Sequence, residues 1–233
     1  MEKLDKLDKL DKLDKLDKLD KLDKLDKLGY DLAVIIEAFN IDVPDESALL
    51  NSWLDAHYTL DQFEQWFFDR IYARTRVDGG YWNEEELKIK FVGSVFDLAD
   101  IDTKNKIKVF YERPLAATVE GYALSVVTDC MVAKPLPFNK PQKPYFFCQE
   151  FKKKRGEKND PEAQMLTAML IAQELNQDNV PIYGGFLFGP YWQFAILDDR
   201  TYINSQDFNA TNADDLLKII FILRKLKDVI LSR

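Results

Sequence analysis

The sequence contains few of the residues that build disulfide scaffolds and transition-metal sites. Its two cysteines, Cys130 and Cys148, are too few for a disulfide framework, and we expect buried thiols in a reduced, cytoplasmic protein. The only histidine, His57, has no cysteine or aspartate at the spacing of metal ligands. C-x-x-C, H-x-x-x-H and G-x-S-x-G motifs are missing, and so is the G-x-x-x-x-G-K-[ST] phosphate loop. These absences exclude a P-loop motor and the common zinc and serine-hydrolase sites.

Long hydrophobic runs are also missing, so we expect neither a membrane span nor a signal peptide. The net charge is −8. The lysines and acids of residues 1–28 cancel, so the excess of acid lies in the rest of the chain. An acidic chain is not typical of a passive nucleic-acid coat protein, although one local basic groove could still meet a phosphate backbone.

Residues 3–26 are eight copies of Lys-Leu-Asp. A period of three moves the leucines around a helix, so they form no stripe and no coiled-coil heptad. Each aspartate has a lysine four residues later, which gives weak helical support. The tract 1–28 is therefore predicted to be a marginal helix or disordered, without a packing role; a partner-binding or oligomerising arm is the alternative.

The remaining pattern predicts an α/β protein with a helical N-terminal segment at 29–80 and an α/β domain at 81–233. In the segment we expect helices at 30–40, 47–57 and 59–76, the last capped by Thr59 with Gln62. Six apolar residues at helical spacing are predicted to be core: Trp53, Leu54, Phe63, Trp66, Phe67 and Ile71. The domain is predicted to have helices at 83–98, 160–176 and 212–231, and strands at 107–112, 123–133, 145–152, 182–188 and 191–197.

Two acids stand out in the strands at 123–133 and 145–152. Asp129 interrupts one apolar strand, and Glu150 lies near the end of the next. Side chains alternate faces in a strand, so Glu150 and Lys152 point the same way. Carboxylates on neighbouring strands could hold Mg²⁺ or Mn²⁺, and Lys152 could stabilise developing negative charge. Glu112-Arg113 is interpreted as an ordinary strand-end pair, with an active-site margin as the alternative.

This set resembles the PD-(D/E)XK nuclease superfamily, which has a restriction-endonuclease-like fold. The resemblance is carried by Asp129, by Glu150-Phe151-Lys152 and by Gln164 in the following helix, within residues 83–198. It implies a mixed sheet flanked by helices. The run from Asn83 to Phe91 is similar to the acidic first-helix motif of nuclease domains in type I restriction motor subunits. That likeness implies Glu84 as a third carboxylate, with Glu86 as rival. Thr128 precedes Asp129 where the superfamily name has proline, although that position is loose.

The basic residues at 152–155 have two interpretations. Lys153, Lys154 and Arg155 could contact a DNA backbone, or they could be a solvated loop. The first hypothesis is a Mg²⁺-dependent endonuclease acting on DNA, with Asp129, Glu150, Lys152 and Gln164 at its catalytic site. The alternative is a non-catalytic module with the same fold that binds nucleic acid or a protein partner. A homodimer or a protein partner through the N-terminal segment is also possible.

Overall fold

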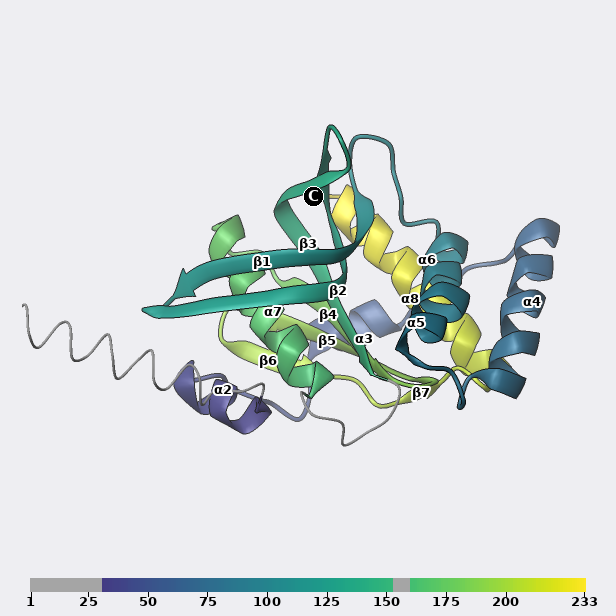
Figure 1. Cartoon of the computed structure of the whole chain (residues 1–233), viewed down its shortest axis with the longest axis horizontal. Helices are drawn as coiled ribbons and strands as arrows, with labels where there is room; N and C mark the ends of the chain where they lie inside the picture. The colour runs from purple at the N-terminus through teal and green to yellow at the C-terminus, as the bar shows by residue number, and fades with distance from the viewer. Residues whose placement is uncertain (1–30, 153–159) are drawn as a thin grey trace, which may run out of the picture.

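The computed structural model describes residues 31–152 and 160–233 (Figure 1). The Lys-Leu-Asp tract and the predicted DNA contacts Lys153, Lys154 and Arg155 lie outside these residues. Within them, no helix is both long and apolar enough to cross a membrane.

The described chain is α/β, with a mixed seven-stranded sheet. The strands are β1 (Lys108–Val119), β2 (Tyr122–Leu136), β3 (Lys140–Lys152), β4 (Ile182–Phe188), β5 (Tyr191–Asp198), β6 (Thr201–Asn204) and β7 (Phe208–Asn209). Strands β1 to β6 lie side by side in chain order, and β7 pairs with β5. All neighbours are antiparallel except β3 and β4, which α7 (Pro161–Asn176) connects in parallel.

A hydrophobic core covers each face of the sheet. One core joins α7 to β-strand residues such as Met131, Cys148 and Phe186. The other joins α8 (Ala213–Leu231) to Phe147, Trp192 and neighbouring residues. Figure 1 shows α7 in green and α8 in yellow on the two sides of the sheet. Both cysteines are buried free thiols, as predicted.

Helix α7 lies unusually close to the sheet. Asp160 caps its start by accepting a hydrogen bond from the Glu162 N–H, and Pro161 occupies the first turn. A Cβ atom added to Gly184 of β4 would lie 2.7 Å from the Met165 sulfur and 2.8 Å from the Met169 sulfur. A glycine at this position therefore allows α7, the helix that follows β3, to pack closely on β4.

The N-terminal helices pack on the same two cores. Helix α2 (Leu32–Ala38) contributes Ile35 to the α7 core, whereas α3 (Ala48–Leu54) and α4 (Gln62–Asp78) pack near α8. The indole N–H of Trp53 donates to the carbonyl of Ile222, 2.9 Å away. The segment is thus anchored to α8 by buried aromatic packing and a buried hydrogen bond.

Two expectations for α4 were wrong. Its cap is Asp61 with Glu64, not Thr59 with Gln62, because the Asp61 and Glu64 side chains each accept from the other residue's N–H. Of the predicted core residues, Trp53 and Ile71 are buried, but Phe63 is 71% exposed and Trp66 is 53% exposed. Trp66 is about 140° around the helix from Ile71, whereas Phe63 is only about 80° away, at the edge of the exposed face.

The predicted helix 83–98 is divided into three pieces. It consists of α5 (Glu84–Leu87), a π-helical segment η1 (Lys88–Val92) and α6 (Gly93–Ala99). A π-helical turn contains more residues than an α-helical turn, so it changes which side chains face the core. Here the adjacent residues Phe91 and Val92 are both fully buried. Asn83 caps the segment as predicted, with Glu86 completing the capping box.

Several strand boundaries also differ. β1 continues past Glu112 to Val119, and β2 and β3 extend into residues 134–144, which the predicted strands at 123–133 and 145–152 left out. Pro114 is tolerated because β1 is the terminal strand of the described sheet. The short strands β6 and β7 were not predicted, because they have too few residues to show an alternating pattern.

The side chain of Gln149 gives a stability prediction. It is fully buried in β3, and neither its amide oxygen nor its amide nitrogen has a hydrogen-bond partner in the described structure. Buried amides without partners cost stability, whereas methionine has a similar shape and no amide. We therefore expect Gln149→Met to increase the free energy of unfolding by about 1 kcal/mol in urea denaturation. The control Gln142→Met, at a partly exposed position of β3, should have a smaller effect. A loss of stability in Gln149→Met would show that the amide is satisfied in solution.

Candidate functional site

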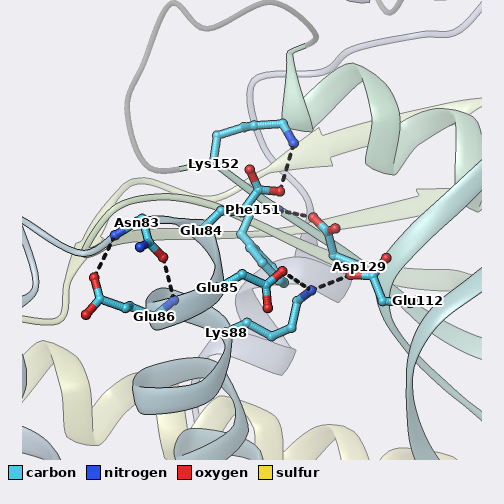
Figure 2. Close-up of polar contacts among 9 residues, drawn as sticks. All are labelled: Asn83, Glu84, Glu85, Glu86, Lys88, Glu112, Asp129, Phe151 and Lys152. Atoms are coloured by element: carbon cyan, nitrogen blue, oxygen red, sulfur yellow. Dashed lines mark hydrogen bonds and ion pairs between the residues drawn. The ribbon is translucent and has the colours of Figure 1, made fainter.

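Asp129 and Glu150 lie on adjacent strands, one position beyond the paired residues Cys130 and Gln149. Each side chain binds the other strand's backbone. The Phe151 N–H donates to Asp129 Oδ2 at 2.9 Å, and the Asp129 N–H donates to Glu150 Oε1 at 3.4 Å. The two acids therefore replace the regular backbone pairing where β2 and β3 separate. Figure 2 shows the contact between Phe151 and Asp129.

Both acids are deeply buried: Asp129 is 8% exposed and Glu150 is 2% exposed. Burial raises the pKa of both carboxyl groups, because it disfavours their charged forms. The pKa of Glu150 is raised well above its usual range, with the negative charge of Asp129 as the next cause. The two groups also share a hydrogen bond that raises the pKa of Glu150 and lowers that of Asp129. The directions of the two shifts favour a proton shared by the pair and held on the Glu150 side.

Lys152 is two residues beyond Glu150 on the same face of β3. Its Nζ atom lies 3.4 Å from Glu84 Oε1, and its positive charge lowers the pKa of both buried acids. The Lys152 side chain is 15% exposed and that of Glu84 is 41% exposed. A positive group beside the acid pair partly offsets the cost of burying two carboxyls.

Of the two predicted candidates for a third carboxylate, the structure brings Glu84 to this site. Glu84 is the first residue of α5, and its charge contributes to the raised pKa of Asp129. Glu86 instead accepts from the Asn83 N–H at 3.2 Å and from Lys90 Nζ at 2.6 Å. The capping box thus explains why the two glutamates point to different partners (Figure 2).

A second lysine, Lys88, lies at the margin of the site and was not predicted. Its Nζ atom bonds Glu112 and lies 3.4 Å from Glu85 and 5.7 Å from the centre of the Phe151 ring. Burial lowers the pKa of Lys88, but the hydrogen bonds and negative charges of Glu112 and Glu85 together outweigh it, so the pKa is raised. The sequence does not reveal the π-helical segment that begins at Lys88. Lys88 is, however, four residues after Glu84, and this helical spacing was a signal that both residues could lie near the site.

Glu112 also belongs to this margin. It lies across from Asp129, between the Tyr111–Cys130 and Arg113–Thr128 pairs. Its φ of 51° is in the left-handed region, which is unusual for a non-glycine residue inside a strand. The sequence placed Glu112 in a strand-end pair with Arg113, whereas in the structure its carboxylate binds Lys88 and β1 continues beyond it.

The other residues singled out in the sequence have no described contact with the acid pair. Gln164 lies in the first turn of α7; its amide oxygen is buried and has no hydrogen-bond partner among the described residues. Lys153, Lys154 and Arg155 lie outside the described residues. His57, expected to lack an acidic partner, lies 2.9 Å from Asp55, but both side chains are largely exposed.

The carboxylate oxygens of this site are the hard ligands that Mg²⁺ and Mn²⁺ prefer. The carboxyl groups of Asp129 and Glu150 are adjacent, and that of Glu84 binds Lys152. In residues 31–152 and 160–233, no three His, Cys, Asp or Glu side chains are grouped closely enough to hold a metal ion as they stand. The chemistry of the acid pair fits a hard divalent cation, but a third protein ligand would require Glu84 to leave Lys152.

Comparison with known proteins adds no assignment: the sequence matches no family profile and no curated protein.

Proposed function

We propose that this protein is a Mg²⁺- or Mn²⁺-dependent endonuclease of the PD-(D/E)XK type, which hydrolyses phosphodiester bonds in DNA. The observation that carries the proposal is the buried Asp129–Glu150 pair with Lys152 on the same face. Burying two neighbouring acids costs stability, and their two backbone hydrogen bonds offset only part of that cost. Coupled, strongly shifted carboxyls of this kind are concentrated at functional sites.

The order of elements supports the same proposal. Helical segments α5 to α6 are followed by three antiparallel strands, by α7 and by β4, which is parallel to β3. The order helix, three strands, helix and strand is similar to that of the PD-(D/E)XK superfamily. The first helix brings Glu84 to the acids, and the parallel connection places α7 directly after the E-x-K strand.

In this proposal Asp129 and Glu150 would hold the cation. A bound Mg²⁺ would supply Lewis-acid stabilisation of the charge that develops on the phosphate and would make a water molecule more acidic. Glu150 must give up its shared proton for the pair to bind a cation, so affinity for the cation should increase with pH. Lys152, released from Glu84, would stabilise negative charge on the reacting phosphate.

The direct test measures melting curves and plasmid cleavage with and without Mg²⁺ or Mn²⁺. The cation binds the folded arrangement, so the wild type should be stabilised, by about 2.7 kcal/mol at 100 times the dissociation constant. Lys152→Ala should keep this stabilisation but cleave about 10²-fold more slowly or worse, because it removes one transition-state donor. Lys140→Ala, at the far end of β3, is the matched control and should cleave like the wild type. A wild type with neither a metal-dependent shift nor cleavage would contradict the proposal and favour a non-catalytic binding module.

A further inference from the structure

Helix α4 has an apolar surface that the rest of the described protein does not cover. Phe63, Trp66 and Val77 are 71%, 53% and 62% exposed. Arg70 and Ala73 lie between them and are also exposed. In contrast, Phe68, Ile71 and Thr75 of the same helix are buried against the core. Helix α4 therefore presents apolar side chains both to the core and to solvent.

The five exposed residues form one regular stripe. Their spacings are three, four, three and four residues, the a/d pattern of a helix that pairs with another helix. At about 100° per residue they occupy a band roughly 80° wide, on the side of α4 away from its buried residues. Figure 1 shows α4 at the outer edge of the molecule, and the residues of the band are exposed.

Charge and side-chain size both change along the helix. Residues 61–69 contain three acids and no base, whereas residues 70–78 contain three arginines and one acid. Glu64 pairs with Arg224, and Arg74 bonds Ser94. Asp61 and Asp69 in the first half have hydrogen bonds only within α4, and neither they nor Arg70 and Arg76 form an ion pair among the described residues. The large side chains, Phe63 and Trp66, are in the first half, and the smaller Ala73 and Val77 are in the second.

We propose that α4 is a self-association surface on which a second copy of the chain pairs, helix against helix and antiparallel. A two-fold axis that passes between Trp66 and Arg70 places the acidic, aromatic half of each copy against the basic, small-residue half of the other. Near that axis, Trp66 of one copy meets Arg70 of the other. Within one copy the guanidinium carbon of Arg70 already lies 5.1 Å from the centre of the Trp66 ring. A parallel pair would instead align acid with acid and arginine with arginine.

The length of the helix limits the strength of this contact. Seventeen residues span about 25 Å, so the interface is at the small end of specific interfaces. We expect a dimer with a dissociation constant on the order of micromolar. This inference does not depend on the proposed nuclease activity.

Analytical ultracentrifugation of the full chain tests the proposal. The wild type should approach twice its mass of 27.2 kDa as the concentration rises to about 100 μM. Trp66→Glu should remain a monomer, and its circular dichroism and melting temperature show whether it is folded. Phe138→Glu is the matched control, because Phe138 is a 95% exposed aromatic residue outside α4; it should dimerise like the wild type.

Disulfide trapping tests the orientation. Gln62 and Arg76 lie on the same flank of the stripe at opposite ends of α4, and the two native cysteines are buried. A mixture of Gln62→Cys and Arg76→Cys proteins should cross-link on mild oxidation, and neither protein should cross-link alone. Cross-linking of each single variant would indicate a parallel pair.

A monomeric wild type, or a dimer that survives Trp66→Glu, would overturn the proposal. If a monomeric wild type instead showed Trp66 fluorescence quenched by a single-stranded oligonucleotide, the stripe would be a base-stacking surface.

Discussion

Replacing Glu150 with glutamine should abolish metal-dependent DNA cleavage and at the same time stabilise the metal-free protein at pH 7. In the metal-free protein Glu150 accepts from the Asp129 N–H, and its raised pKa favours a protonated carboxyl that donates to Asp129. A glutamine amide can make both hydrogen bonds, so the variant resembles the protonated glutamate. It cannot become the second anionic ligand that a divalent cation requires. The metal-dependent rise in melting temperature should therefore be lost with the activity.

The gain in stability should depend on pH. The pKa of Glu150 in the folded protein is raised above its ordinary value of 4.5. Below that value the carboxyl is protonated in the folded and unfolded states and has no pH-dependent cost. As the pH rises towards the folded-state pKa, the unfolded chain releases the proton more readily, and the wild type loses stability. The melting temperatures of wild type and Glu150→Gln should thus converge below about pH 4 and separate towards neutral pH.

Glu120→Gln is the control for this comparison. Glu120 is an exposed residue paired with Arg200, so its replacement should leave cleavage and the metal-dependent shift unchanged. A Glu150→Gln protein that cleaves DNA at the wild-type rate would remove Glu150 from the catalytic site. A constant difference in melting temperature from pH 4 to 8 would show that its proton is not held by burial.

Trp53→Ala should lower the free energy of unfolding by about 3–5 kcal/mol. Trp53 is 2% exposed, and its ring packs edge-on against Tyr183 and Phe194 at centroid distances of 4.7 and 5.2 Å. The truncation would leave a large cavity between α3, α8 and the sheet and would leave the Ile222 carbonyl without the indole N–H. The loss should be measured by urea denaturation monitored by circular dichroism.

Trp53→Phe is the matched variant, because it retains an aromatic ring but removes the hydrogen bond. It should destabilise the protein much less than Trp53→Ala. Unfolding of both variants should remain a single transition, since α3 and α8 share a core with the sheet. A loss below about 1 kcal/mol in Trp53→Ala, or a separate early transition, would show that the segment at 29–80 unfolds independently of the α/β part.

The sequence predicted the relative positions of the candidate residues well where local rules decide the geometry. Strand alternation placed Glu150 and Lys152 on one face, and the Asp160-Pro161 pair predicted the start of α7. Pairing of the two acid-bearing strands brought Asp129 beside Glu150 as expected. These features depend on neighbouring residues, or on two strands that are consecutive in the chain.

Features that depend on tertiary packing could not be predicted in the same way. The π-helical turn at Lys88 accompanies the burial of two adjacent residues, Phe91 and Val92, and the sequence does not show that both are buried. The lysine–glutamate contacts at the margin of the site join residues distant in the sequence, such as Lys88 and Glu112. Helical spacing predicted apolar faces on α4, but it could not distinguish the buried face from the exposed Phe63 and Trp66.

The left-handed residue in β1 has a consequence for the open edge of the sheet. β1 ends the sheet of the described residues, and a terminal strand of twelve residues is a template on which another chain could add as a further strand. Glu112 interrupts the regular strand conformation, and two residues later Pro114 lacks a backbone donor. An incoming strand could pair only with the short stretches of regular strand before Glu112 and after Pro114. The same backbone kink that places Glu112 against Lys88 thus protects the edge against aggregation by strand addition.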